Sequence, residues 1–161
     1  MRDELSRLPP ELAASLSGEG FRRRRRLVIL LATTDADGFA RIALLTMGEV
    51  RAASDSRLAV AVQARSRTAV NLVRRANATI LYLSRNLTAS VQARAGRGRV
   101  CRTDPERRLF PLRVESVRID RPAPTEAGVD LLTGPTFTGR GAGALFSDEL
   151  FLELAEAAAT A

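Results

Sequence analysis

The chain has 161 residues, of which 45% are hydrophobic and 27% charged, the proportions of an ordinary globular domain. Its 25 basic residues are all arginines, and the chain contains no histidine. The absence of histidine excludes a Ser-His-Asp triad and histidine-ligated zinc or haem. The single cysteine, Cys101, excludes a disulfide framework, and no apolar run is long enough to cross a bilayer. We therefore expect a cytoplasmic protein of one domain, 1–161, with no metal site and no membrane contact.

The chain begins with a predicted helical segment, 1–20. Leucines recur at helical spacing through residues 4–16, and Pro10 suits the first turn of a helix. A β-hairpin is expected next, made of an apolar strand at 27–34, a turn at 35–38 and a returning strand at 39–47. Aspartate is common in such turns, so Asp35 and Asp37 are predicted to be turn residues, and Gly38 supplies the positive φ.

The centre of the chain is predicted to alternate strands with one helix. The expected strands are a short one around Val50, then 58–64, 79–84 and 87–100, the last bent at Gly96 and Gly98. Residues 68–76 are predicted to be helical because apolar positions including Val73 recur on one face, and Ser66 is a natural N-cap. Closely spaced strands around a single helix favour an antiparallel barrel over a parallel sheet.

The C-terminal third carries two helix-start signals. Asp104-Pro105-Glu106 has an aspartate cap and a first-turn proline, and Ser147 precedes a segment expected to be helical to about Ala157. Residues 112–120 alternate as a strand does. The sequence therefore predicts a mainly β fold, with a barrel core at 25–120 and a C-terminal loop and helix at 122–161.

One group of residues is suited to binding a phosphate. Ser66 caps a helix whose first N–H groups and positive dipole end attract anions, Arg67 adds a planar guanidinium fork, and Thr68 adds a hydroxyl. Arg41, on a neighbouring predicted strand, could reach the same anion. We therefore predict a phosphate site at this helix end.

The stretch RIALLTMGEV…LAVAVQARSRTAVNLVRRANATILYL resembles the core of the pyridoxamine 5′-phosphate oxidase-like split barrels, which bind FMN. In the oxidases the second strand reads Arg-x-Val-Leu-Leu-Lys, and a later segment reads Ser-Arg-Lys before a helix and an Ala-x-Leu strand. The matching segments here are Arg41–Thr46, Ser66–Thr68 and Ala78–Leu81. The resemblance covers roughly residues 25–120 and implies a split β-barrel with flanking helices, working as a homodimer that holds FMN at its interface.

The resemblance also implies which residues hold the phosphate and the isoalloxazine ring. The implied set is Arg41, Ile42, Ala43, Leu44, Thr46, Val62, Ser66, Arg67, Thr68, Asn71 and Gln92. Threonine replaces both family lysines, at Thr46 and Thr68, so the positive charge has to come from Arg41 and Arg67. Leu44 and Val62 would line the ring, and Gln92 would reach its edge. No side chain stands out as a catalytic proton donor.

Several functions remain open from the sequence. The C-terminal tail lacks the Arg/His/Trp segment with which the oxidases bind pyridoxal phosphate, so we expect a flavin-dependent oxidoreductase of unassigned small-molecule substrate, not a true pyridoxamine phosphate oxidase. The alternatives are a split-barrel reductase using the deazaflavin F420, and a cofactor-free dimer that binds a small anion or a partner. Nucleic-acid binding through runs such as Arg22–Arg26 ranks last, because aromatic residues make up only 4% of the chain.

Overall fold

The computed structural model describes residues 2–19, 26–85, 87–120, 131, 133–137 and 147–161. The predicted features at 22–25, 122–128 and 139–143 lie outside these residues. The described strands are β1 (Arg2–Leu5), β2 (Val28–Thr34), β3 (Ala40–Thr46), β4 (Val50–Ala52), β5 (Arg57–Gln63), β6 (Asn77–Ser84), β7 (Leu87–Ala95), β8 (Arg99–Val100) and β9 (Arg107–Asp120). The helices are α1 (Pro10–Ser17), the short 3₁₀ helix η1 (Met47–Glu49), α3 (Arg67–Arg75) and α4 (Asp148–Ala159).

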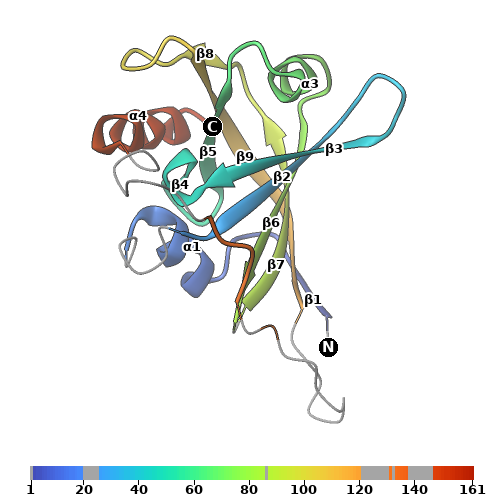
Figure 1. Cartoon of the computed structure of the whole chain (residues 1–161). Helices are drawn as coiled ribbons and strands as arrows, with labels where there is room; N and C mark the ends of the chain where they lie inside the picture. The colour runs from blue at the N-terminus through green and yellow to red at the C-terminus, as the bar shows by residue number, and fades with distance from the viewer. Residues whose placement is uncertain (1, 20–25, 86, 121–130, 132, 138–146) are drawn as a thin grey trace.

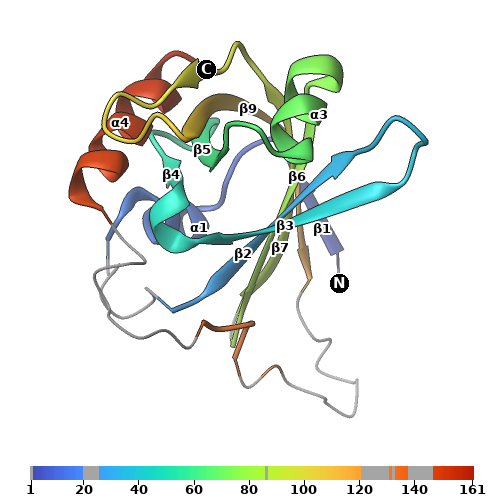
Figure 2. The same ribbon diagram turned by 45° about the horizontal axis from the view of Figure 1, so that its top comes forward.

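The strands form one curled antiparallel sheet in the order β3-β2-β6-β7-β9-β5-β4, with β1 and β8 also pairing with β9 (Figure 1). The sheet bends into a half-barrel, and α3 lies at one end of it while α4 covers the outside of β5 (Figure 2). The prediction of a mainly β, antiparallel split barrel is therefore confirmed. In the described part of the chain no helix is long and apolar enough to span a membrane.

The hydrophobic core lies on the concave face of the sheet. Alternate residues of β2, Ile29, Leu31 and Thr33, point inward and are buried, and the β3 residues paired with them share that face. Tyr82 and Phe110, both at most 1% exposed, are the largest fully buried side chains of the core. The convex face of β2, β3 and β6 has no covering helix among the described residues.

The β2–β3 hairpin forms as its sequence predicts. The seven residues of each strand pair from Val28 with Thr46 to Thr34 with Ala40, and Gly38 adopts a φ of 89° in the turn. The returning strand ends at Thr46 because the carboxylate of Glu49 accepts a hydrogen bond from the Thr46 N–H at 2.7 Å, which starts η1.

Helix α3 begins where the capping signal places it. Ser66 Oγ accepts a hydrogen bond from the Ala69 N–H at 3.1 Å, and Ala76 ends the helix in a left-handed conformation with φ 59°. Ala69 and Leu72 are buried as predicted, whereas Val73 is 56% exposed. The prediction for Val73 was wrong because the buried stripe of this short helix is narrower than its apolar pattern.

Three other predicted boundaries were also wrong. Residues 4 and 5 belong to β1 rather than to a helix, because the Pro9-Pro10 pair delays α1 until Pro10. Residues 87–100 form two strands, β7 and β8, rather than one. Asp104 caps no helix: its carboxylate accepts from the Glu106 N–H at 3.1 Å and closes a turn that leads into β9.

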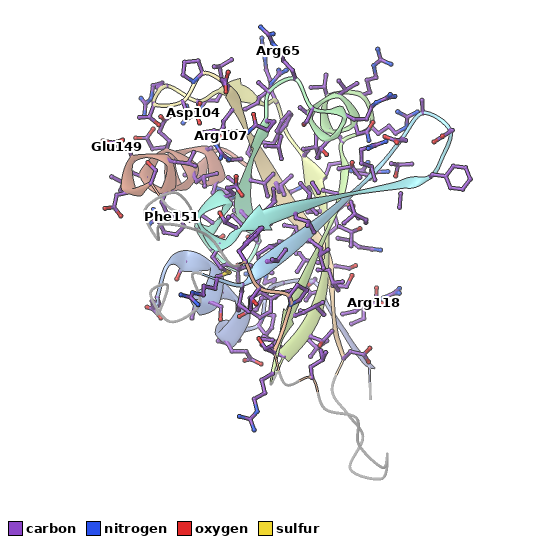
Figure 3. All side chains as sticks on the ribbon, in the orientation of Figure 1. Arg65, Asp104, Arg107, Arg118, Glu149 and Phe151 are labelled. Carbon is purple, nitrogen blue, oxygen red and sulfur yellow. The ribbon has the colours of Figure 1, made fainter. Side chains whose placement is uncertain are left out.

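Helix α4 is predicted correctly by its cap, since Ser147 Oγ accepts from the Leu150 N–H at 3.2 Å. Its buried side chains, Leu150, Leu154, Ala157 and Ala158, pack on Ala59, Ala61, Cys101 and Leu109 in a second apolar cluster. Strand β5 is thus buried on both faces. Phe151 of α4, labelled in Figure 3, also contacts Arg51, whose guanidinium carbon lies 4.3 Å from the centre of the Phe151 ring.

Candidate functional site

The amino end of α3 is the first component of the candidate site. The N–H groups in the first turn of a helix have no acceptor within the helix, and Ser66 satisfies the one of Ala69. The main-chain N–H groups of Arg67 and Thr68 remain oriented toward the helix end, where the helix dipole is positive. Arg67 is exposed, while Thr68 is buried.

The second component is a carboxylate that sequence reasoning treated only as a turn residue. Asp35 receives the Nε–H of Arg41, 3.0 Å from Oδ1 and 2.9 Å from Oδ2, while Arg41 Nη2 lies 2.9 Å from Oδ2. The buried amide of Asn71 donates to Asp35 Oδ1 at 2.8 Å and to Thr33 Oγ1 at 3.1 Å. Asp35, whose side chain is 13% exposed, therefore joins the hairpin to α3.

The groups around Asp35 favour its negative charge. The hydrogen bond from Asn71 and the guanidinium of Arg41 lower the pKa of Asp35 below its ordinary value, although burial opposes them. The positive charge of Arg67 acts in the same direction, although Arg67 has no hydrogen bond or ion pair with Asp35 among the described contacts. Arg41 and Asn71, which we predicted to hold the cofactor, thus contact the carboxylate of Asp35.

The predicted ring-binding residues fall on two faces of the sheet. Ile42 and Leu44 lie on the convex face of β3 and are 54% and 59% exposed. Ala43 lies on the opposite face and packs against the core. Arg41 is on the same face as Ala43, at the end of the strand. Gln92 shares the convex face with Ile42, because the strand registers align Ile42, Ala32, Thr79 and Gln92 in one row. Gln92 Oε1 accepts a hydrogen bond from Ser116 Oγ at 2.9 Å.

Two predicted residues do not join either group. Val62 is 3% exposed because it points into the concave core, where it packs in one cluster with Ala69 and Leu72 of α3. Thr46 lies at the far end of β3, about 16 Å along the strand from Arg41. Its buried Oγ1 has no hydrogen-bond partner among the described residues. Thr46 is therefore separate from Arg41, and Val62 is enclosed by other core side chains.

A sequence signal for Asp35 does exist. In a hairpin with Thr33 opposite Arg41, Asp35 is a diagonal neighbour of Arg41. Opposite charges at such positions attract each other across antiparallel strands. The turn interpretation of Asp35 was correct but incomplete, because its main chain forms the turn while its carboxylate reaches the neighbouring helix.

Comparison with solved structures agrees with this architecture. A Lactobacillus delbrueckii protein assigned as a pyridoxamine 5′-phosphate oxidase superposes with a TM-score of 0.53 and 17% identity, over 70% of this chain and 94% of that one. An FMN-binding protein from Syntrophomonas wolfei also gives 0.53, with 11% identity over 70% and 88% of the two chains. The chain has the split-barrel fold.

The likeness to known proteins is confined to the fold. No family model matches the sequence, and no curated protein is significantly similar to it. The resemblance inferred from the motifs around Arg41 and Ser66 is confirmed for the fold, because both of these solved structures are split barrels.

Proposed function

We propose that this protein is a homodimeric split barrel that binds the phosphate of a flavin-type cofactor, with FMN as the first choice, at the amino end of α3. The observation that carries the proposal is the helix end itself, capped by Ser66 and bordered by the exposed guanidinium of Arg67. The function is then that of a flavin-dependent oxidoreductase. When bound, the flavin would supply the hydride or electron transfer.

The residues at the helix end fit a phosphate, with one condition. The N–H groups of Arg67 and Thr68 and the guanidinium of Arg67 form a donor set for a dianion. Arg41 and Asn71 can add to that set only if the phosphate displaces the carboxylate of Asp35 from them. The chain's own roles are therefore to hold the phosphate through Arg67 and the helix end, and to hold Arg41 in place through Asp35 beforehand.

The convex face supports the dimer. Ile42 and Leu44 are large, exposed apolar side chains, and Leu30, Leu81 and Leu83 on the same face are only partly buried. A continuous apolar surface of this kind is typical of protein–protein contacts. In the proposal it packs against a second copy of the chain and forms an apolar wall for the ring.

Flavin titrations test the cofactor site. Arg67→Ala should weaken FMN about ten- to a hundredfold, because one charge-assisted phosphate contact is lost. Binding of riboflavin, which has no phosphate, should change little. Arg65→Ala is the matched control, since Arg65 is also exposed, two residues away, and projects into solvent at the top of the molecule (Figure 3). Equal weakening of FMN and riboflavin by Arg67→Ala would contradict the proposal.

Light scattering tests the dimer. The mass should be twice 17.4 kDa, and Leu44→Glu should shift it toward the monomer because a charge enters the apolar contact. Leu152→Glu provides the control, since Leu152 is 61% exposed on α4, away from the convex face. A monomer in the unmodified protein would overturn the dimer.

The cofactor-free alternative is favoured by one observation, the occupation of Arg41 by Asp35. If the unmodified protein binds neither FMN, riboflavin nor F420, this alternative replaces the flavin proposal, and Asp35 is then a permanent internal partner of Arg41.

A further inference from the structure

Three arginines stand side by side on the convex face of the sheet, away from the amino end of α3. The strand registers place Arg57 of β5 opposite Arg113 of β9, and Arg113 opposite Arg94 of β7. Directly paired residues point to the same face and lie within about 5.5 Å of each other. Like charges at such positions destabilise a sheet. This arginine row (Arg57, Arg113 and Arg94) therefore concentrates positive charge on one part of the sheet.

A cavity of about 360 Å³ opens beside the row. Its lining combines Arg94–Arg97 from the end of β7 and the following loop with Pro111 and Arg113 of β9, and Thr160 and Ala161 lie on its other side. Arg97 thus brings a further guanidinium to the same space. The cavity is large enough for a small ligand, and the charged side chains that line it, Arg94, Arg97 and Arg113, are all cationic.

The carboxylates around the cavity do not balance these charges. Glu115 Oε1 accepts from Arg94 at 3.2 Å and lies 3.9 Å from Arg113, so one carboxylate serves two arginines. Arg57 instead donates to the main-chain carbonyl of Ala159 at 3.1 Å, at the end of α4. Arg113 keeps a side chain that is 67% exposed, and its guanidinium has no closer carboxylate among the described residues.

We propose that this cavity binds a small polyanion, a molecule with two or more phosphate or carboxylate groups. Guanidinium groups recognise both kinds of oxyanion through paired N–H donors. Neighbouring strands place the arginines about 4.8 Å apart, a spacing that suits adjacent anionic groups of one molecule. The bound anion would also remove the repulsion within the row.

This site is distinct from the proposed flavin site. The cavity lies beyond the carboxyl end of α3, where the Ala95 N–H donates to the Ala76 carbonyl at 2.7 Å. Ser66 and Arg67 lie at the opposite end of the helix, about 14 Å away along its axis. The proposal therefore stands whether or not the protein binds a flavin.

Calorimetric titration of the full chain with inorganic pyrophosphate, and separately with citrate, tests the proposal at low ionic strength. We expect saturable binding of at least one anion, and the tighter one identifies the chemical class. Arg113→Gln should weaken that binding about tenfold, equivalent to about 1.4 kcal/mol. Arg97→Gln should have a similar effect and disturbs no described hydrogen bond or ion pair of the sheet.

Arg118→Gln is the matched control. Arg118 is exposed on the same strand, carries the same charge, and lies 3.8 Å from a carboxylate oxygen of Glu4 (Figure 3). It should leave anion binding unchanged. Thermal melts give a second readout: at one anion concentration, the Tm of the unmodified protein should rise more than that of Arg113→Gln. The proposal is overturned if neither anion binds, if Arg118→Gln weakens binding as much as Arg113→Gln, or if Arg67→Ala abolishes binding.

Discussion

Two carboxylates of this protein are each held by arginine, but by different means. Asp35 lies at the rim of the hairpin, and its carboxylate accepts hydrogen bonds from the side chains of Arg41 and Asn71. Glu153 of α4 is 4% exposed and accepts from the main-chain N–H groups of Arg102 at 3.0 Å and Thr103 at 2.8 Å. The guanidinium of Arg99 adds a further contact to Glu153 at 2.9 Å.

The difference separates a structural contact from an exchangeable one. Main-chain donors cannot turn away, so removing Glu153 would leave two N–H groups without an acceptor and loosen the loop after β8 from α4. The partners of Asp35 are side chains at a partly open rim, so another anion can take its place at a lower cost. The first carboxylate belongs to the fold and the second to the candidate site.

Replacing Glu153 should give the largest effect. Glu153→Ala is expected to lower the free energy of unfolding by about 2–4 kcal/mol, because buried N–H groups and Arg99 lose their acceptor. Urea unfolding measures the loss. Glu156→Ala is the control, since Glu156 is 59% exposed and contacts the exposed Arg102, an ion pair worth about 0–1 kcal/mol. Equal losses of unfolding free energy in the two variants would show that the main-chain hydrogen bonds of Glu153 stabilise the fold no more than the exposed ion pair of Glu156.

The pH dependence of stability should distinguish the same residue. Burial alone would raise the pKa of Glu153, but hydrogen bonds from Arg102, Arg99 and Thr103 lower it far below its ordinary value of 4.5. The unfolded chain therefore binds this proton more readily, so the stabilisation is complete above about pH 4.5 and is lost as the pH falls toward the folded pKa. Unfolding midpoints between pH 6 and pH 3, about the range of glutamate titration, should fall less steeply in Glu153→Gln than in the unmodified protein.

Asp35→Asn should produce a smaller change that appears in binding rather than in stability. Without the carboxylate, Arg41 becomes available to the phosphate, and FMN should bind about tenfold more tightly. Riboflavin binding should not change. Asp37→Asn is the control, because Asp37 lies in the same turn and its carboxylate accepts only the Phe39 N–H in the described contacts, at 3.3 Å. An unchanged FMN affinity in Asp35→Asn would mean that Asp35 does not compete with the phosphate.

Local signals predicted the parts of the fold that depend on neighbouring residues. The hairpin around Gly38 and the caps of Ser66 and Ser147 were confirmed because turns and caps are decided within a few residues. The prediction of a helix start at Asp104 was wrong because an aspartate before proline starts turns as well as helices, and the pairing of β9 with distant strands decides between them. The sequence alone does not show which distant strands pair with β9.

The candidate site was predictable to a similar extent. The proximity of Arg41 and Asn71 follows from one hairpin and one capped helix, and the structure brings both to Asp35. Which face of β5 would carry Val62 could not be read from its strand, because the apolar run is continuous and the inward face is decided only when the sheet curls around the core.

Strand β9 has a consequence for how the molecule folds. It pairs with β1, β5, β7 and β8. In the pairing with β1, Asp120 lies opposite Arg2. When residues up to 100 have been synthesised, β2, β3, β5, β6 and β7 are present, but β9, which lies between β7 and β5 in the sheet, is not. Such distant pairings make folding slow, on the order of milliseconds to seconds. Until β9 emerges, the nascent chain exposes the open edge of β7 to other strands.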